Sequence, residues 1–92
     1  NMPNVISGLI SKSDGSPAMG AILTVYDVNG IPVRALKTNK LGQFLSVTSL
    51  SSGQYRIEVE SQDAEFNPVS INLTGQVMAP LEIGEKGDRA SS

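Results

Sequence analysis

Two neighbouring segments of the chain share a layout that restricts what it can fold into. Each opens with a glycine, Gly42 or Gly53, and each carries an aromatic residue two positions later, Phe44 or Tyr55. Residues 55–59 then alternate between apolar and charged side chains. A period of two places alternate residues on opposite faces of a strand. The layout therefore predicts consecutive short β-strands, each with one face in a core.

Turn signals separate similar segments along the rest of the chain. The strongest are residues 13–17, which combine Ser, Asp, Gly and Pro, and the pair Asn29-Gly30. Asn-Gly tolerates the positive φ angles of a tight hairpin. Turn signals at intervals of roughly 8–12 residues are typical of β-sandwiches and barrels. The predicted strands are residues 4–12, 21–28, 32–38, 43–47, 54–61, 69–73 and 79–83, with one helical turn at 62–65.

The expected core is aliphatic. The 92 residues suit one domain and include only two Tyr and two Phe, so Val, Ile and Leu must fill most of the interior. β-Branched residues fit the pleated, half-buried surface of a sheet. The expected core residues are Ile6, Ile10, Leu23, Val25, Phe44, Leu50, Tyr55, Ile57, Val59, Ile71, Leu73 and Leu81.

Composition excludes several function classes. The formal net charge is −2 and the seven basic residues are scattered, whereas a nucleic-acid site needs clustered Lys and Arg. The chain has no Cys and no His, which removes disulfides, thiolate metal sites and the commonest general base. No apolar run approaches the roughly 18 residues of a membrane span. We therefore expect no nucleic-acid partner and no membrane insertion by this fragment.

Short motifs follow one another in an order that belongs to a known family. They are Ile6-x-Gly8-x-Ile10, Asp14-Gly15-x-Pro17-x-x-Gly20-Ala21, Val25, Thr38, Gly42-x-Phe44, Leu50 and Gly53-x-Tyr55-x-Ile57-x-Val59. Residues 4–83 resemble the carboxypeptidase regulatory-like domain family, which is related to the B-type repeats of Gram-positive collagen adhesins. The resemblance implies an all-β fold, a seven-stranded antiparallel β-sandwich of the prealbumin-like (transthyretin-like) type with an Ig-like Greek key. It also implies close packing at Gly8 and positive φ at Gly42 and Gly53.

The resemblance further implies a setting for the domain. Such domains are accessory or spacer parts of larger secreted or membrane-associated proteins. Residues 30–44 are similar to those of domains attached to bacterial conjugation or secretion-related membrane proteins. The expected partners are other domains of the parent protein or another protein, and a membrane-associated or extracellular parent is favoured. We expect residues 1–3 to be a linker or remnant, 4–83 the domain, and the polar residues 84–92 a disordered tail.

One chemical hypothesis comes from the adhesin repeats. These join a Lys on the first strand to an Asn on the last, with a buried acid between them. The candidates here are Lys12, Asn72 and either Glu58 or Glu60. Lys12 lies at the end of its predicted strand, and both glutamates fall on the polar face of a strand whose other face is in the core. Asn72 belongs to the sixth strand and not to the last. Because unpaired charges in a small core are costly, we interpret all four as solvated surface residues.

Metal binding and hydrolysis are both poorly supported. Calcium needs several converging oxygen ligands; Asp63-Ala64-Glu65 supplies too few, while Asp14 and Asp27 belong to turn motifs. Transthyretin-related hydrolases depend on His, which is absent here, and the serines have no base partner. We therefore expect no catalytic residues, no metal site and no cofactor.

Three apolar or aromatic residues remain outside the expected core. Ile22, Tyr26 and Leu45 have outward parity, so they form a candidate interaction face. The function expected from the sequence is a non-enzymatic accessory domain of a larger bacterial protein, acting as a structural spacer or protein-interaction module. The alternative is a cell-surface adhesin or carbohydrate-binding module, for which Tyr26 is the candidate aromatic contact.

Overall fold

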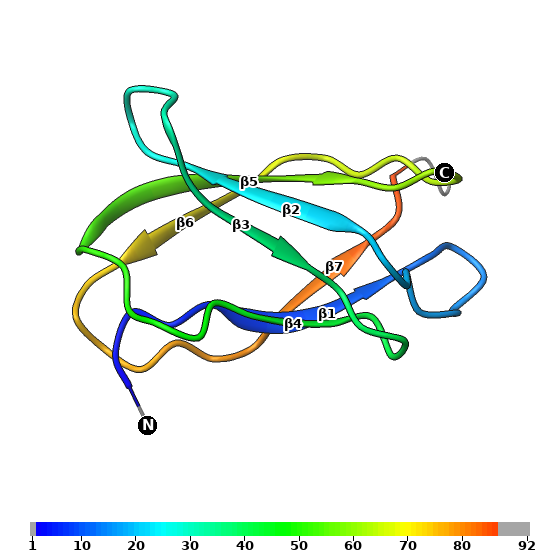
Figure 1. Cartoon of the computed structure of the whole chain (residues 1–92), viewed down its shortest axis with the longest axis horizontal. Coiled ribbons are helices and arrows are strands. Elements are labelled where there is room, and N and C mark those ends of the chain that lie inside the picture. The colour runs from blue at the N-terminus through cyan, green and yellow to red at the C-terminus, as the bar shows by residue number, and fades with distance from the viewer. Residues whose placement is uncertain (1, 87–92) are drawn as a thin grey trace.

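The computed structural model describes residues 2–86 and consists of seven strands (Figure 1). They are β1 (Ser7–Ser11), β2 (Ile22–Tyr26), β3 (Pro32–Lys37), β4 (Gln43–Leu45), β5 (Gly53–Glu60), β6 (Val69–Leu73) and β7 (Leu81–Gly84). Every predicted strand is present. The helical turn predicted at 62–65 is absent, because an isolated bridge between Glu60 and Glu65 holds that segment open. The expected tail began at residue 84, but β7 continues to Gly84, and the amides of Glu85 and Lys86 are hydrogen-bonded to the domain. The remaining part of that tail, 87–92, lies outside the described residues.

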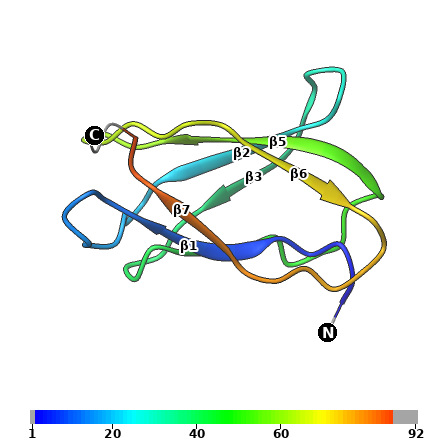
Figure 2. The ribbon, with the colours of Figure 1, turned by 180° about the vertical axis from the view of Figure 1, so that it is seen from behind.

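The strands form two sheets packed face to face, which confirms the β-sandwich. One sheet has the order β4-β1-β7 and the other β3-β2-β5-β6. All pairs are antiparallel except β1 and β7, which run parallel. Each connection reverses the chain direction, so the first and seventh strands point the same way. Figure 2 shows β7 beside β1.

The core lies between the sheets and agrees with the alternating pattern. All the expected core residues are buried except Tyr55 and Leu81, which are half-buried and pack against the cluster. Ala18, Ala21 and Ile83 complete the interior. Each large aliphatic side chain removed from water contributes roughly 1.5–3 kcal/mol, so this cluster is the main source of stability.

Two glycines are required by close contacts. A β-carbon on Gly8 would overlap the carbonyl oxygen of Leu81 and come within 2.8 Å of the Phe44 ring. A β-carbon on Gly42 would overlap the carbonyl oxygen of Ile10, and its φ of +77° favours glycine. The close packing expected at Gly8 and the positive φ expected at Gly42 are both confirmed, as is the positive φ of Gly53, at +150°.

Candidate functional surfaces

The structure does not bring the three candidate interaction residues together. Ile22 and Tyr26 lie on β2, on the outer face of the four-stranded sheet, whereas Leu45 lies on β4 of the three-stranded sheet. The two outer faces point away from each other across the sandwich. The alternating pattern predicts which side chains face outward, but it does not say which sheet a strand joins. The three residues therefore do not make one continuous face.

The outer face of the four-stranded sheet carries a stacked Arg–Tyr pair at the end of β2. Tyr26 lies opposite Arg56 in the register of β2 and β5, and the guanidinium carbon is 4.9 Å from the centre of the ring. Arg56 Nε also donates to Glu58 Oε2 at 2.8 Å. This geometry fits a cation–π contact reinforced by an exposed ion pair. A sugar that stacked on Tyr26 would compete with Arg56 for the ring.

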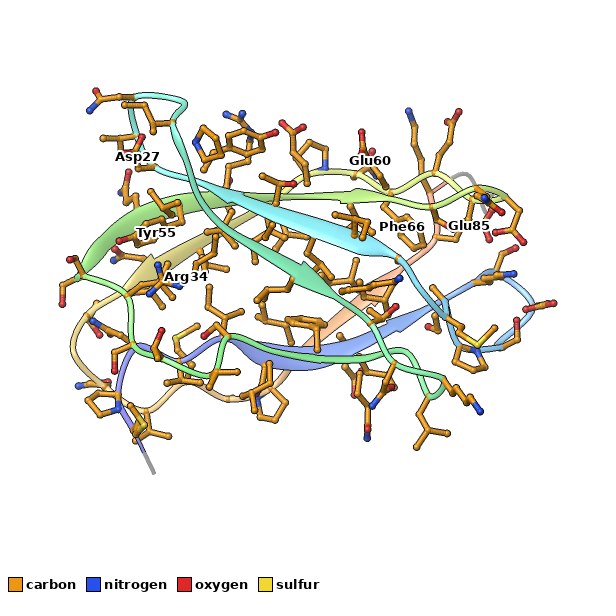
Figure 3. All side chains as sticks on the ribbon, in the orientation of Figure 1. Asp27, Arg34, Tyr55, Glu60, Phe66 and Glu85 are labelled. Carbon is orange, nitrogen blue, oxygen red and sulfur yellow. The ribbon has the colours of Figure 1, made fainter. Side chains whose placement is uncertain are left out.

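The remaining aromatic rings are also engaged within the fold. Phe44 is buried, and Phe66 and Tyr55 are half-buried (Figure 3). The Tyr55 hydroxyl donates to the carbonyl oxygen of Ser51 at 2.6 Å. Carbohydrate sites usually stack sugars on exposed aromatic faces, and none of these rings is exposed.

The outer face of the three-stranded sheet carries a shallow groove with an apolar centre. Leu9 is 40% exposed and Leu45 is 55% exposed. They lie in a depression of about 670 Å³ that crosses all three strands, with Lys37 and Glu82 among its polar lining residues. An exposed apolar area with a polar border is a common mark of a protein contact. The sequence did not lead us to predict Leu9 as part of an interaction face. Its outward orientation could have been predicted, because it is next to Ile10, which faces the core.

The cross-link candidates lie apart and are individually engaged. Lys12 Nζ donates to Asp63 Oδ2 at 2.6 Å, just beyond the end of β5 that holds Glu60. Asn72 pairs with Gln54 near the opposite end of the same strand. Glu58 accepts the hydrogen bond from Arg56. The arrangement provides no Lys–acid–Asn constellation among these residues.

The Lys12–Asp63 pair is the main electrostatic feature of this end of the molecule. The hydrogen bond from Lys12 lowers the pKa of Asp63, and the same bond raises the pKa of Lys12. The Asp63 side chain is exposed and that of Lys12 is partly exposed, so solvent screens the pair and it contributes little to stability.

The carboxylates of two turns act within those turns. Asp14 Oδ1 accepts hydrogen bonds from the Ser16 hydroxyl at 2.6 Å and the Ser16 amide at 2.9 Å, and the hydroxyl bond is the main cause of a lowered Asp14 pKa. Asp27 Oδ1 accepts from the amides of Asn29 and Ile31 at 2.9 and 3.0 Å. This is ordinary Asx-turn chemistry, as the sequence indicated.

Neither a metal cluster nor a membrane-crossing helix is present in the described part of the chain. Within residues 2–86, no group of three or more Asp and Glu side chains converges as a metal site would require. The same residues include no helix with the length and hydropathy needed to cross a membrane.

The chain is similar to part of a solved bacterial pilin. That structure is the T6 backbone pilin of serotype M6 Streptococcus pyogenes, described as having a modular three-domain structure decorated with variable loops and extensions. The TM-score is 0.64 and the identity 30%, over 75% of this chain and 16% of the pilin chain. No family model matches the chain, and neither does any curated protein. The likeness agrees with the β-sandwich fold, and the chain spans only a small part of the pilin's length.

Proposed function

We propose that this chain is a non-enzymatic β-sandwich module of a larger bacterial surface protein, in which it serves as a structural spacer. The observation that carries the proposal is the 30% identity and 0.64 TM-score to a portion of a modular backbone pilin. The resemblance to carboxypeptidase regulatory-like domains supports the same role, because those are accessory domains of larger secreted or membrane-associated proteins.

The placement of the chain ends supports a spacer role. The molecule measures 35 × 26 × 21 Å along its principal axes. Within residues 2–86, the chain begins near one end of the long axis and ends near the other (Figure 1). Modules joined end to end in this way would add length to the parent protein along its axis.

Small-angle X-ray scattering of two tandem copies tests the spacer role. We expect a maximum dimension close to twice the 35 Å long-axis extent of one copy, with a single copy as the control. A tandem protein no longer than one copy would contradict an end-to-end spacer. Labelling of intact cells by an antibody against this domain tests the surface location, and labelling only after lysis would contradict it.

The protein-interaction role is a second candidate, and the groove around Leu9 and Leu45 favours it. The occupant we propose is a neighbouring domain of the same parent protein, since apolar centres with polar borders suit such contacts. NMR spectra of this chain, alone and fused to its neighbour, test this. Shifts confined to β1, β4 and β7 support docking, and unchanged shifts contradict it.

The carbohydrate-binding alternative has weaker support, because Arg56 already lies over Tyr26. A glycan titration followed through the Tyr26 ring resonances tests it. Saturable shifts that disappear in Tyr26→Ala would support a sugar site. Unchanged resonances across a broad glycan panel would count against one.

A further inference from the structure

The first and last strands of the domain are hydrogen-bonded neighbours that run in the same direction. β1 and β7 pair in parallel from Gly8 opposite Leu81 to Ser11 opposite Gly84. The chain enters β1 at one end of this pair and leaves β7 at the other. A pull on the two chain ends therefore draws the two strands past each other along their length.

The segment that leads into β1 is fixed to the body of the domain by Asn4. This side chain is 7% exposed. Its Nδ2 donates to the Leu50 carbonyl at 3.0 Å and to Ser52 Oγ at 3.1 Å, while its Oδ1 accepts from the Gly75 amide at 2.8 Å. The Asn4 backbone amide donates to Gln76 at 3.0 Å, and its carbonyl accepts from the Leu50 amide at 3.0 Å. These bonds hold the entry point to both the β4–β5 and β6–β7 connections.

The segment that follows β7 is fixed in the same way. The Glu85 amide donates to the Ser11 carbonyl at 3.1 Å, which extends the pairing with β1 by one step. The Glu85 carboxylate accepts from the Ser13 amide at 2.9 Å, and the Lys86 amide donates to the Glu65 carbonyl at 2.7 Å. Figure 3 places Glu85 at the opposite end of the long axis from Tyr55, which neighbours the Asn4 contacts through Ser51.

We propose that β1 and β7, with the Asn4 and Glu85 attachments, form a load-bearing clamp that resists tension between the two ends of the chain. In a parallel pair the hydrogen bonds are evenly spaced along the strands. Tension along the strands loads all of these bonds together, whereas opening from one end breaks them in turn. Resistance to force is a matter of the unfolding rate rather than of equilibrium stability. The clamp needs no covalent cross-link. It rests on the proposed spacer function, because a spacer in a surface protein carries tension between its neighbours.

Single-molecule pulling in two geometries tests the clamp. The full chain has no Cys, so added cysteines give unique attachment points. In the first geometry, cysteines precede Asn1 and follow Ser92, which shears β1 against β7. In the second, the C-terminal attachment is replaced by Ala79→Cys, an exposed position just before β7. This geometry loads both strands at the same end and peels them apart. We expect a several-fold higher unfolding force in the first geometry, and equal forces overturn the proposal.

Matched variants separate the clamp from global stability. Ile83 on β7 and Ile71 on β6 are both buried isoleucines of edge strands, 6% and 8% exposed. Ile83→Val and Ile71→Val should lower equilibrium stability by similar amounts. We expect only Ile83→Val to reduce the end-to-end unfolding force substantially. Equal reductions by the two variants would show that the force reflects overall stability, which contradicts a local clamp.

The pulling experiments and the scattering experiment test the clamp and the spacer role separately. A domain that unfolds at equal force in both geometries has no clamp, even if tandem copies extend end to end in scattering. Tandem copies that fold back on each other contradict the spacer role, even if a single domain shows the directional resistance.

Discussion

The carbonyl oxygen of Leu81 occupies the space that a β-carbon on Gly8 would need. The Phe44 ring closes the same space from the core side, 2.8 Å from that position. This contact lies at the start of the β1–β7 pairing, where Gly8 is opposite Leu81, so Gly8 sets how closely the first and last strands approach there. A side chain there must move either the backbone of β7 or a core ring.

The first prediction concerns Gly8→Ala. Overpacking a filled interior typically costs about 1–3 kcal/mol, and here the obstructing atom is backbone, so we expect a loss at the upper end of that range. Urea unfolding followed by circular dichroism measures it through a lower midpoint. Gly84→Ala is the matched control, because nothing lies within 4 Å of its β-carbon position on β7. Equal midpoints for the two variants would contradict the steric account.

The second prediction concerns Asn4, which combines a buried amide with a φ of 56°. Asn4→Gly keeps access to this backbone conformation but removes the side chain. Asn4→Ala removes the side chain and is also strained at positive φ. We expect both to be destabilised by about 1–3 kcal/mol from the unpaired groups left behind, with Ala the worse.

Hydrogen exchange at the Gly75 amide checks the local cause of this loss. That amide donates to Asn4 Oδ1 in the structure, so its protection should fall sharply in both Asn4 variants. Asn72→Ala, at an exposed position of β6, should leave it unchanged. Retained protection of Gly75 in Asn4→Gly would show that the side chain does not hold the β6–β7 connection.

The strands could be predicted from the sequence because their signals are local. The charged and apolar alternation of β5 and the Asn29-Gly30 turn each depend on neighbouring residues only. The pairing of β1 with β7 joins the two ends of the chain, and no local pattern encodes it. For the same reason, outward parity identified Leu45 and Tyr26 as surface residues but could not assign them to opposite sheets.

Asn4 could not be predicted as a buried residue. It opens the first predicted strand directly after Pro3, a position where Asn is ordinarily a solvated turn residue. Its burial depends on the β4–β5 and β6–β7 connections meeting at the same point. Tyr55 shows the opposite case: its inward parity is right, yet its hydroxyl reaches the Ser51 carbonyl and keeps the ring at the border of the core.

The third prediction concerns Thr38, which is 4% exposed and closes the opposite end of the sandwich from Asn4. Its hydroxyl accepts from the Ala21 amide at 2.8 Å and donates to the Ala18 carbonyl at 2.6 Å. Thr38→Val keeps the shape but leaves both backbone groups unpaired, at a cost of about 1–3 kcal/mol. Thr38→Ser keeps the hydroxyl and should lose less. Thermal unfolding measures both, and a Val variant as stable as the Ser variant would contradict this role.

The fourth prediction concerns the pH dependence of the Lys12–Asp63 pair. Because the hydrogen bond from Lys12 lowers the pKa of Asp63 in the folded state, its stabilisation is present above the unfolded pKa of about 3.9. It is lost as pH falls through the lower folded value. The raised pKa of Lys12 acts in the opposite range: its contribution is present below the ordinary lysine pKa and is lost as pH rises through the raised value. The pair therefore contributes across the whole neutral range.

A carboxyl ¹³C NMR titration measures this pair directly. In Lys12→Met the pKa of Asp63 should rise toward its ordinary value, whereas Lys40→Met, at an exposed lysine that is not among the causes of the Asp63 shift, should leave it in place. Asp14 should respond less than Asp63 to Lys12→Met, since the Ser16 hydroxyl is the main cause of its lowered pKa and the charge of Lys12 is a smaller one. An Asp63 pKa that does not respond to Lys12→Met would mean that the ion pair does not persist in solution. The Glu60–Glu65 bridge and the Glu65–Lys86 backbone bond would then remain to hold residues 62–65 to the rest of the domain.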